Sequence, residues 1–133
     1  MIKPAKQIFL SLPAIIIAAI IFIVSNTPNP GLPKLGIIWE DKLLHFIAYF
    51  IFGLSIILFL IVNLKSFNKN KIIILTLLLG AFYSASDEIH QYYIPGRYSD
   101  ITDWIADMAG ILLSITLINK LKNNIFKPND EIF

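Results

Sequence analysis

Residues 7–24 read QIFLSLPAIIIAAIIFIV, an uncharged and mostly apolar run that is long enough to cross the hydrocarbon core of a bilayer. A cleaved signal peptide is the alternative interpretation, because Lys3 and Lys6 precede the run. The run is longer than the usual hydrophobic region of about 7–15 residues, however, and no small-residue cleavage site follows it. We therefore expect a retained membrane-spanning helix in this part of the chain.

The composition of the whole chain favours a membrane protein. Its 133 residues are 56% hydrophobic and 15% charged, whereas an ordinary soluble domain carries roughly 25% charged residues. A formal net charge of +2 gives no concentrated basic surface, so nucleic-acid binding is not expected. The lack of cysteine excludes disulfides, thiolate metal sites and cysteine nucleophiles.

Three further apolar runs follow, at 46–62, 72–86 and 108–119, and polar or charged residues flank each of them. A segment in hydrocarbon must pair its own backbone groups, and none of these runs alternates as a barrel strand would. We therefore predict an all-α fold, a four-transmembrane-helix bundle formed by a single domain over residues 1–133. Its helices are expected at about 7–25, 42–63, 71–91 and 101–120.

Basic residues divide unevenly between the two sides of this layout. One side holds Lys3, Lys6, Lys65, Lys69, Lys71, Lys120, Lys122 and Lys127, and the other holds Lys34, Lys42 and Arg97. Because the side richer in lysine and arginine stays in the cytoplasm, both termini are expected inside. The loops at 26–41 and 89–101 would then face out, and both tryptophans and all five tyrosines would lie in the outer half.

The acidic side chains gather on the outer side, which holds Glu40, Asp41, Asp87, Glu88, Asp100, Asp103 and Asp107. Three helices carry a polar stripe there. At about 100° per residue, each stripe groups residues on one face of its helix. The second helix has Asp41, His45 and Tyr49, the third has Ser84, Asp87, Glu88 and Gln91, and the fourth has Asp103, Asp107, Gly110 and Ser114. Because ionisable groups facing lipid are costly, the stripes are expected to face one another and form a polar cavity open to the outside. Small residues spaced by four, such as Gly80 and Ser84 or Ala106 and Gly110, would let the third and fourth helices approach closely there.

Some of these acids also have structural interpretations. Asp41 can cap the second helix, and Asp100 or Ser99 can cap the fourth, with Asp103 in its first turn. A carboxylate in a first turn also complements the helix dipole. For these residues a structural and a functional role both stay open.

Asp87, Glu88 and Asp107 are harder to explain as structural residues. The first two lie near a helix C-terminus, where the dipole disfavours negative charge, so a cation must offset them. The available cations are Lys42, His45 and Arg97, the last presented by a turn at Pro95-Gly96-Arg97. Asp107 lies too far inside its helix to cap it and must be paired, metal-bound or protonated. His45 can act as a structural hydrogen-bonding residue, a proton-transfer group or a metal ligand.

The outer-side segments form a distinctive combination: DKLLHFIAY at 41–49, DEIHQYYIPGR at 87–97 and DWIADMAG at 103–110. Together they resemble the VanZ-like family of small bacterial membrane proteins. That family is named for a protein linked to resistance to teicoplanin, a glycopeptide antibiotic that acts on cell-wall precursors outside the membrane. The family pattern covers Asp41, Lys42, His45, Tyr49, Asp87, Glu88, Gln91, Arg97, Asp103 and Gly110, and it has Asn where this chain has Asp107. The resemblance implies a location in the bacterial cytoplasmic membrane.

The stripes and the resemblance together define a candidate site. The candidate catalytic residues are His45, Asp87, Glu88 and Asp103. The candidate substrate-binding residues are Asp41, Lys42, Tyr49, Gln91, Arg97 and Asp107. If a divalent metal ion is a cofactor, its ligands would be Asp87, Glu88 and Asp103; otherwise His45 with a carboxylate would do acid–base work.

Three classes of function stay open. The first is action at the outer leaflet on an envelope component, such as a lipid-linked cell-wall precursor or a lipophilic glycopeptide. The second is a non-catalytic binding or accessory protein whose ion-pair network is structural. A proton- or ion-coupled transporter ranks last, because no charged residue continues the polar path toward the cytoplasmic half of the last three helices. The lipid bilayer is an expected partner, and nucleic acid is not. Whether the protein is an enzyme is left open.

Overall fold

The computed structural model describes residues 3–28, 39–64 and 66–125, and all its regular elements in that part of the chain are helices. In chain order they are α1 (Pro4–Ser25), α2 (Glu40–Asn63), α3 (Lys69–Tyr92), α4 (Ile101–Ile115) and α5 (Ile118–Ile125). The predicted all-α class is therefore confirmed for the described residues. By length and composition, α1, α2 and α3 could each cross a membrane.

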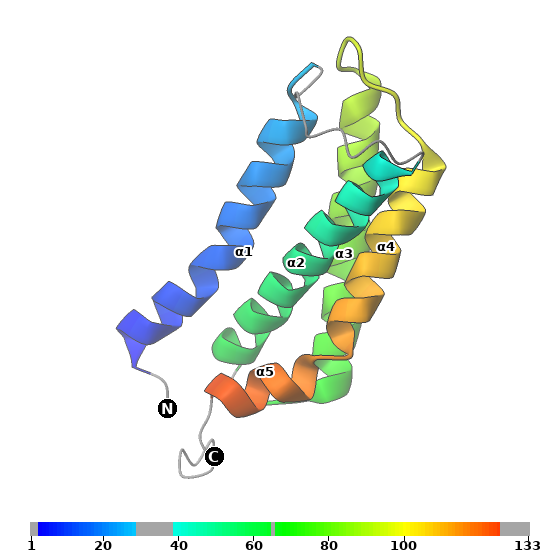
Figure 1. The fold of residues 1–133 in the computed structure, drawn as a ribbon. Helices are drawn as coiled ribbons and strands as arrows, with labels where there is room; N and C mark the ends of the chain where they lie inside the picture. The colour runs from blue at the N-terminus through cyan, green and yellow to red at the C-terminus, as the bar shows by residue number, and fades with distance from the viewer. Residues whose placement is uncertain (1–2, 29–38, 65, 126–133) are drawn as a thin grey trace.

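Helix α2 is the central element of the bundle. It packs along α4 over most of its length and also contacts α1 and α3, as Figure 1 shows. Its apolar residues Phe52, Ile57 and Leu60 form the core together with Ile72 of α3 and Ile111 of α4. Helix α1 buries little of its surface and leaves a row of isoleucine and phenylalanine side chains exposed. Such a face suits lipid rather than water as its surroundings.

The fourth predicted helix differs from the expected range of 101–120. It ends at Ile115, and residues 118–125 form the separate helix α5, which turns across one end of the bundle (Figure 1). The turn between them tightens through backbone hydrogen bonds from Thr116 to Leu113 (3.2 Å) and from Leu117 to Ser114 (3.0 Å). No glycine or proline marks this break; the buried side chain of Ile118 holds α5 against the core instead. Helix α5 therefore covers the bundle end rather than extending α4.

Glycines define two close helix contacts, and one of them differs from the expectation. Gly80 of α3 faces the side chain of Ile111 on α4, as the small-residue spacing predicts. Gly110 of α4 instead lies against the backbone of α2, where an added Cβ would come within 2.7 Å of the amide nitrogen of Phe50. Gly53 of α2 faces Ser114 across the same interface. The closest backbone approach defined by these glycines is therefore between α2 and α4.

The helices separate the charged residues between the two ends of the bundle. One end holds Lys3, Lys6, Lys69, Lys71, Lys120 and Lys122. The opposite end holds the acids from Glu40 to Asp107 together with Lys42 and Arg97. Lys34, Lys65 and Lys127, and most of the loop expected at 26–41, lie outside the described residues.

Candidate functional site

The centre of the acidic end is a hydrogen-bonded group of three side chains from three helices. Asp107 of α4 has a fully buried side chain, and its Oδ1 accepts from Nδ1 of His45 on α2 at 2.9 Å. Its other oxygen accepts from Oγ of Ser84 on α3 at 2.5 Å. The imidazole keeps 18% of its side-chain surface exposed, so it links the buried carboxylate to the exterior of the bundle. Asp107 is thus a paired residue, one of the three states expected for it.

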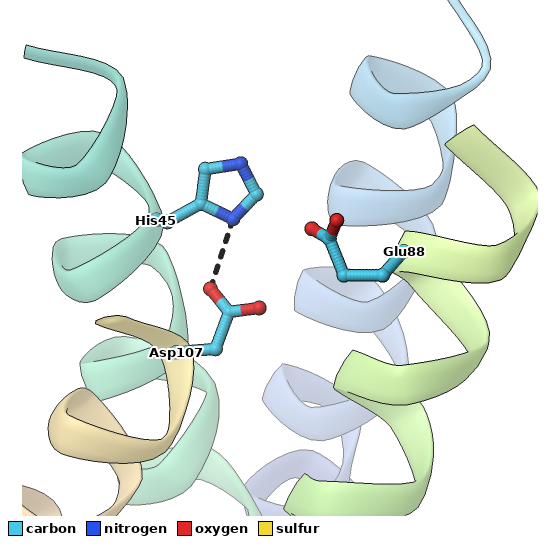
Figure 2. A group of neighbouring side chains, drawn as sticks. All are labelled: His45, Glu88 and Asp107. Carbon is cyan, nitrogen blue, oxygen red and sulfur yellow. Dashed lines mark hydrogen bonds and ion pairs between the residues drawn. The ribbon is translucent and has the colours of Figure 1, made fainter. Parts of the chain in front are cut away.

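Glu88 of α3 completes this centre from the opposite side. Figure 2 shows its carboxylate pointing toward His45 and Asp107 from the facing helix. One potential ligand atom from each of His45, Glu88 and Asp107 lies within 4.8 Å of the other two. Oε2 of Glu88 accepts from the backbone N–H of Asp100 at 2.9 Å, whereas its buried Oε1 has no hydrogen-bond partner in the described part of the chain. We call His45, Glu88 and Asp107 the histidine–carboxylate centre.

A second group of charges surrounds Lys42, one turn before His45 on α2. Its Nζ lies 2.8 Å from Asp41, 3.2 Å from Asp100 and 2.7 Å from Asp103. Asp103 is largely buried, whereas the side chain of Asp41 is 57% exposed and lies away from the centre. These ion pairs bind the first turn of α2 to the first turn of α4. We call this group the Lys42 network.

The capping residues differ in part from the alternatives left open by the sequence. Asp100 is the N-cap of α4, and its side chain accepts from the backbone N–H of Thr102 at 2.9 Å. This bond, with the ion pair to Lys42, lowers the pKa of Asp100 to about 2. Asp41 does not cap α2, because the N-cap position is Trp39 and no side chain accepts a hydrogen bond there. Asp41 lies instead in the first turn, where it complements the dipole.

Asp87, Gln91 and Arg97 connect α3 and its following turn to α1 rather than to the centre. Nε2 of Gln91 lies 3.2 Å from Oδ2 of Asp87 and 3.3 Å from Oγ of Ser25. Arg97 donates to the backbone oxygen of Val24 at 3.0 Å, near the C-terminal end of α1. A cation there complements the α1 dipole. The expectation that Arg97 offsets Asp87 and Glu88 is therefore not met by the described contacts.

Tyr49 lies one turn beyond His45 on α2, and its side chain is almost fully buried. Its hydroxyl has no hydrogen-bond partner among the described residues. An unpaired hydroxyl in such a position is costly unless something outside the protein pairs with it. Glu88 likewise has a buried oxygen, Oε1, without a hydrogen-bond partner among the described residues.

The structure brings together some of the predicted site residues and separates others. His45 and Glu88 share the centre with Asp107, whereas Asp103 belongs to the Lys42 network and Asp87 pairs with Gln91. The expected metal set of Asp87, Glu88 and Asp103 thus shares only Glu88 with the group whose potential ligand atoms lie within 4.8 Å of one another. Ser84 was on a predicted stripe but was not singled out as a site residue. Its position one turn before Glu88 on the same face was the available signal.

These features define a class: a helical protein of membrane-like composition, with a buried histidine–carboxylate centre at the acidic end of its bundle. A family comparison then identifies the group within this class. The chain belongs to the VanZ/LLP1 family, whose model matches residues 9–123. The resemblance inferred from the three outer-side segments is thereby confirmed. No curated protein and no solved structure gives a match to this chain.

Proposed function

We propose that the protein acts at the outer face of the bacterial cytoplasmic membrane on a lipid-linked or lipophilic envelope molecule, with His45 as its proton-transfer group. The observation that carries this proposal is the convergence of His45, Glu88 and Asp107 from three helices at one end of an apolar bundle. An imidazole changes its charge near neutral pH and serves as a general acid or base. The hydrogen bond to the buried Asp107 orients the His45 ring, and part of the ring surface is exposed.

The proposed topology has four spans, with both termini in the cytoplasm. Three of the spans are α1, α2 and α3. Helix α4 has 15 residues, about 22 Å of helix, and lies along α2. A span this short is accommodated by local thinning of the bilayer. The six described lysines at the end that carries α5 support a cytoplasmic position for that end.

Proximity to the outer membrane surface supports a lipophilic or lipid-linked substrate. Asp107 lies within about two turns of the first residue of α4, and Glu88 lies about one turn from the end of α3. A molecule held in the outer leaflet could reach it without leaving the membrane. Teicoplanin and lipid-linked cell-wall precursors both combine an apolar anchor with a polar head, and the family resemblance points to that chemistry.

A non-catalytic accessory role is the second candidate, and the Lys42 network favours it. Three carboxylates gather around a single ammonium group, an arrangement that holds two helix starts together without any chemistry. This explains Lys42, Asp100 and Asp103 as structural residues. It does not explain the unpartnered Oε1 of Glu88, which lies outside the network. We therefore assign the structural role to the Lys42 network and the chemical role to the centre.

A tolerance assay tests the proposed function. Wild-type protein, His45→Gln and Glu88→Gln would be expressed at equal membrane abundance in a glycopeptide-sensitive bacterium, and the minimal inhibitory concentration of teicoplanin measured. We expect the wild type to raise this concentration and both variants to return it to the vector level. His90→Gln is the matched control, because His90 contacts Asn26 (3.2 Å) and Phe22 of α1, away from the centre. If His45→Gln and Glu88→Gln both keep full teicoplanin tolerance, the chemical role is refuted and only the non-catalytic accessory role remains.

Cysteine labelling tests the proposed orientation independently of activity. The chain has no cysteine, so single Ser99→Cys and Lys122→Cys variants need no background substitutions. A membrane-impermeant maleimide should label Ser99→Cys in intact cells and Lys122→Cys only after lysis. The reverse pattern would place the centre on the cytoplasmic side and contradict the proposal.

A further inference from the structure

The three side chains of the histidine–carboxylate centre share an arrangement typical of metal ligands. Each supplies one nitrogen or oxygen atom, and these atoms lie within 4.8 Å of one another. Two ligands that bind one zinc ion at about 2.1 Å in tetrahedral geometry lie about 3.5 Å apart. Nδ1 of His45 and Oδ1 of Asp107 lie 2.9 Å apart, and the Glu88 carboxylate faces both residues (Figure 2).

Two of the three potential ligands are also hydrogen-bonded, through their other oxygen, to a second group. Oδ2 of Asp107 accepts from Ser84 at 2.5 Å, and Oε2 of Glu88 accepts from the Asp100 backbone at 2.9 Å. For the third, His45, the carboxylate of Asp103 lies 3.9 Å from Nε2, which is too far for a hydrogen bond. Outer partners of this kind orient the ligands of metal sites and set the tautomer of a ligating histidine.

An unpartnered oxygen supplies an independent indication that something binds here. Glu88 is 6% exposed, and its Oε1 has no hydrogen-bond partner among the described residues although its side chain faces the centre. A buried carboxylate oxygen without a partner is costly. A bound cation would satisfy it.

The charges of the centre point to a cation of charge two. With a neutral imidazole, the two carboxylates carry a formal charge of −2, and Lys42, one turn before His45, is already surrounded by Asp41, Asp100 and Asp103. A divalent ion would make the centre neutral. In an apolar bundle a neutral centre is strongly favoured over an unbalanced one.

We propose that His45, Glu88 and Asp107 bind one divalent first-row transition metal ion, with zinc as the best-matched ion. A mixed imidazole and carboxylate set suits zinc or manganese better than magnesium, which prefers oxygen ligands and bound water. Three protein ligands leave a coordination position open, as in catalytic zinc sites, where the ion acts as a Lewis acid toward water or a substrate oxygen. The use of the ion in catalysis rests on the proposed function, whereas its binding does not.

Metal titration of the full-length protein tests this inference. The protein would be purified in detergent without a histidine tag, stripped with a chelator, and titrated separately with Zn²⁺, Mn²⁺ and Mg²⁺ by isothermal calorimetry. We expect one Zn²⁺ per chain, with Mg²⁺ at least 100-fold weaker. Glu88→Gln and His45→Gln should each lower the Zn²⁺ affinity at least 100-fold, and Ser84→Ala roughly tenfold, as expected for an outer partner.

Two control variants make the outcome specific. His90→Gln removes the other histidine, and Asp87→Asn removes the neighbouring acid of the same helix; both should keep the wild-type Zn²⁺ affinity. Thermal unfolding by circular dichroism would check that each variant is folded. If His45→Gln fails to fold, Glu88→Gln still decides, because its side-chain oxygen can keep the hydrogen bond from Asp100.

Several results would overturn the proposal: no saturable Zn²⁺ or Mn²⁺ binding, unchanged affinity in folded Glu88→Gln, or an equal loss in Asp87→Asn. These results are distinguishable from a failure of the proposed function. Absent metal binding with lost teicoplanin tolerance in His45→Gln would leave His45 and Asp107 as a metal-free acid–base pair. Metal binding with unchanged tolerance in both centre variants would refute the proposed function and leave the metal site standing.

Discussion

Replacing Gly110 with alanine should separate the two helices that carry His45 and Asp107. Gly110 lies one turn after Asp107, and its missing side chain lets α4 rest on the α2 backbone next to His45. An added Cβ would meet the carbonyl oxygen of Phe46 and would lie 2.7 Å from the amide nitrogen of Phe50. These are backbone atoms of a packed helix, so no side-chain rotation relieves the contact.

The size of the displacement follows from these distances. Ordinary contact requires about 3.4 Å, so the Phe50 nitrogen alone requires α2 and α4 to move apart by about 0.7 Å, and the closer Phe46 oxygen requires at least as much. The same movement would stretch the bond between His45 and Asp107 from 2.9 Å to about 3.6 Å, beyond hydrogen-bond distance. Overpacking costs roughly 1–3 kcal/mol, and the lost hydrogen bond about 1 kcal/mol. Alanine regains about 1 kcal/mol of helix propensity, so we expect a net loss of roughly 1–3 kcal/mol.

Gly80→Ala is the matched control for this prediction. The substitution is the same and the bundle is the same, but the new Cβ would meet side-chain carbons of Ile111, at 2.8–3.2 Å, and no backbone atom among its nearest contacts. We expect a smaller loss of stability than in Gly110→Ala, because a side chain can adjust by less costly movements than a helix backbone and helix propensity improves.

The assay is reversible unfolding in mixed micelles, followed by circular dichroism, with the minimal inhibitory concentration of teicoplanin as the functional readout. Gly110→Ala should lower both the unfolding free energy and the tolerance, and Gly80→Ala should leave the tolerance unchanged. A Gly110→Ala protein as stable as the wild type, or a larger loss in Gly80→Ala, would refute the reasoning that the α2 and α4 backbones position the centre.

Two further predictions concern the Lys42 network. Lys42→Met should lower the unfolding free energy by about 1–3 kcal/mol, because the largely buried Asp103 loses its cation; Lys120→Met, at the exposed opposite end, should not change it. The pKa of Asp100 falls from 3.8 unfolded to about 2 in the fold, so its stabilising contribution is present above pH 3.8 and is lost as the pH falls through 2. The amide proton of Thr102, followed by NMR in micelles, should report this transition, and Asp100→Asn should remove it. A Thr102 transition centred near pH 4 would contradict the lowered pKa of Asp100.

Helical periodicity predicted which polar side chains turn inward, and the structure confirms most of it. Ser84, Asp87, Glu88 and Gln91 are all buried along α3, and Asp103, Asp107, Gly110 and Ser114 are buried along α4. The reason is physical: on a rigid α-helix the backbone alone sets the direction in which a side chain leaves, at about 100° per residue. The apolar surroundings then exclude the alternative in which the acids face outward.

The pairing between stripes could not be predicted in the same way. Arg97 and Lys42 have long, flexible side chains, and their partners depend on which groups the neighbouring helix ends leave open. Arg97 binds the carbonyl of Val24 because the end of α1 lies beside the turn after α3, a relation between helices that no local pattern encodes. The end of α4 at Ile115 was missed for a similar reason, because packing of Ile118 against the core, and not a glycine or proline, starts the next helix.

The contacts of Lys42 determine which acidic partner is left for His45 on the same helix. Lys42 and His45 are three residues apart, so they lie on the same face and approach the same acids of α4. Because Lys42 holds Asp103 at 2.7 Å, that carboxylate stays 3.9 Å from Nε2 of His45, too far for a hydrogen bond. The histidine is thereby left with one firm partner, Asp107, and one face toward Glu88. A purely structural bundle would gain stability by pairing every one of these groups, so the oxygen of Glu88 that no described residue satisfies favours a ligand-binding role for the centre.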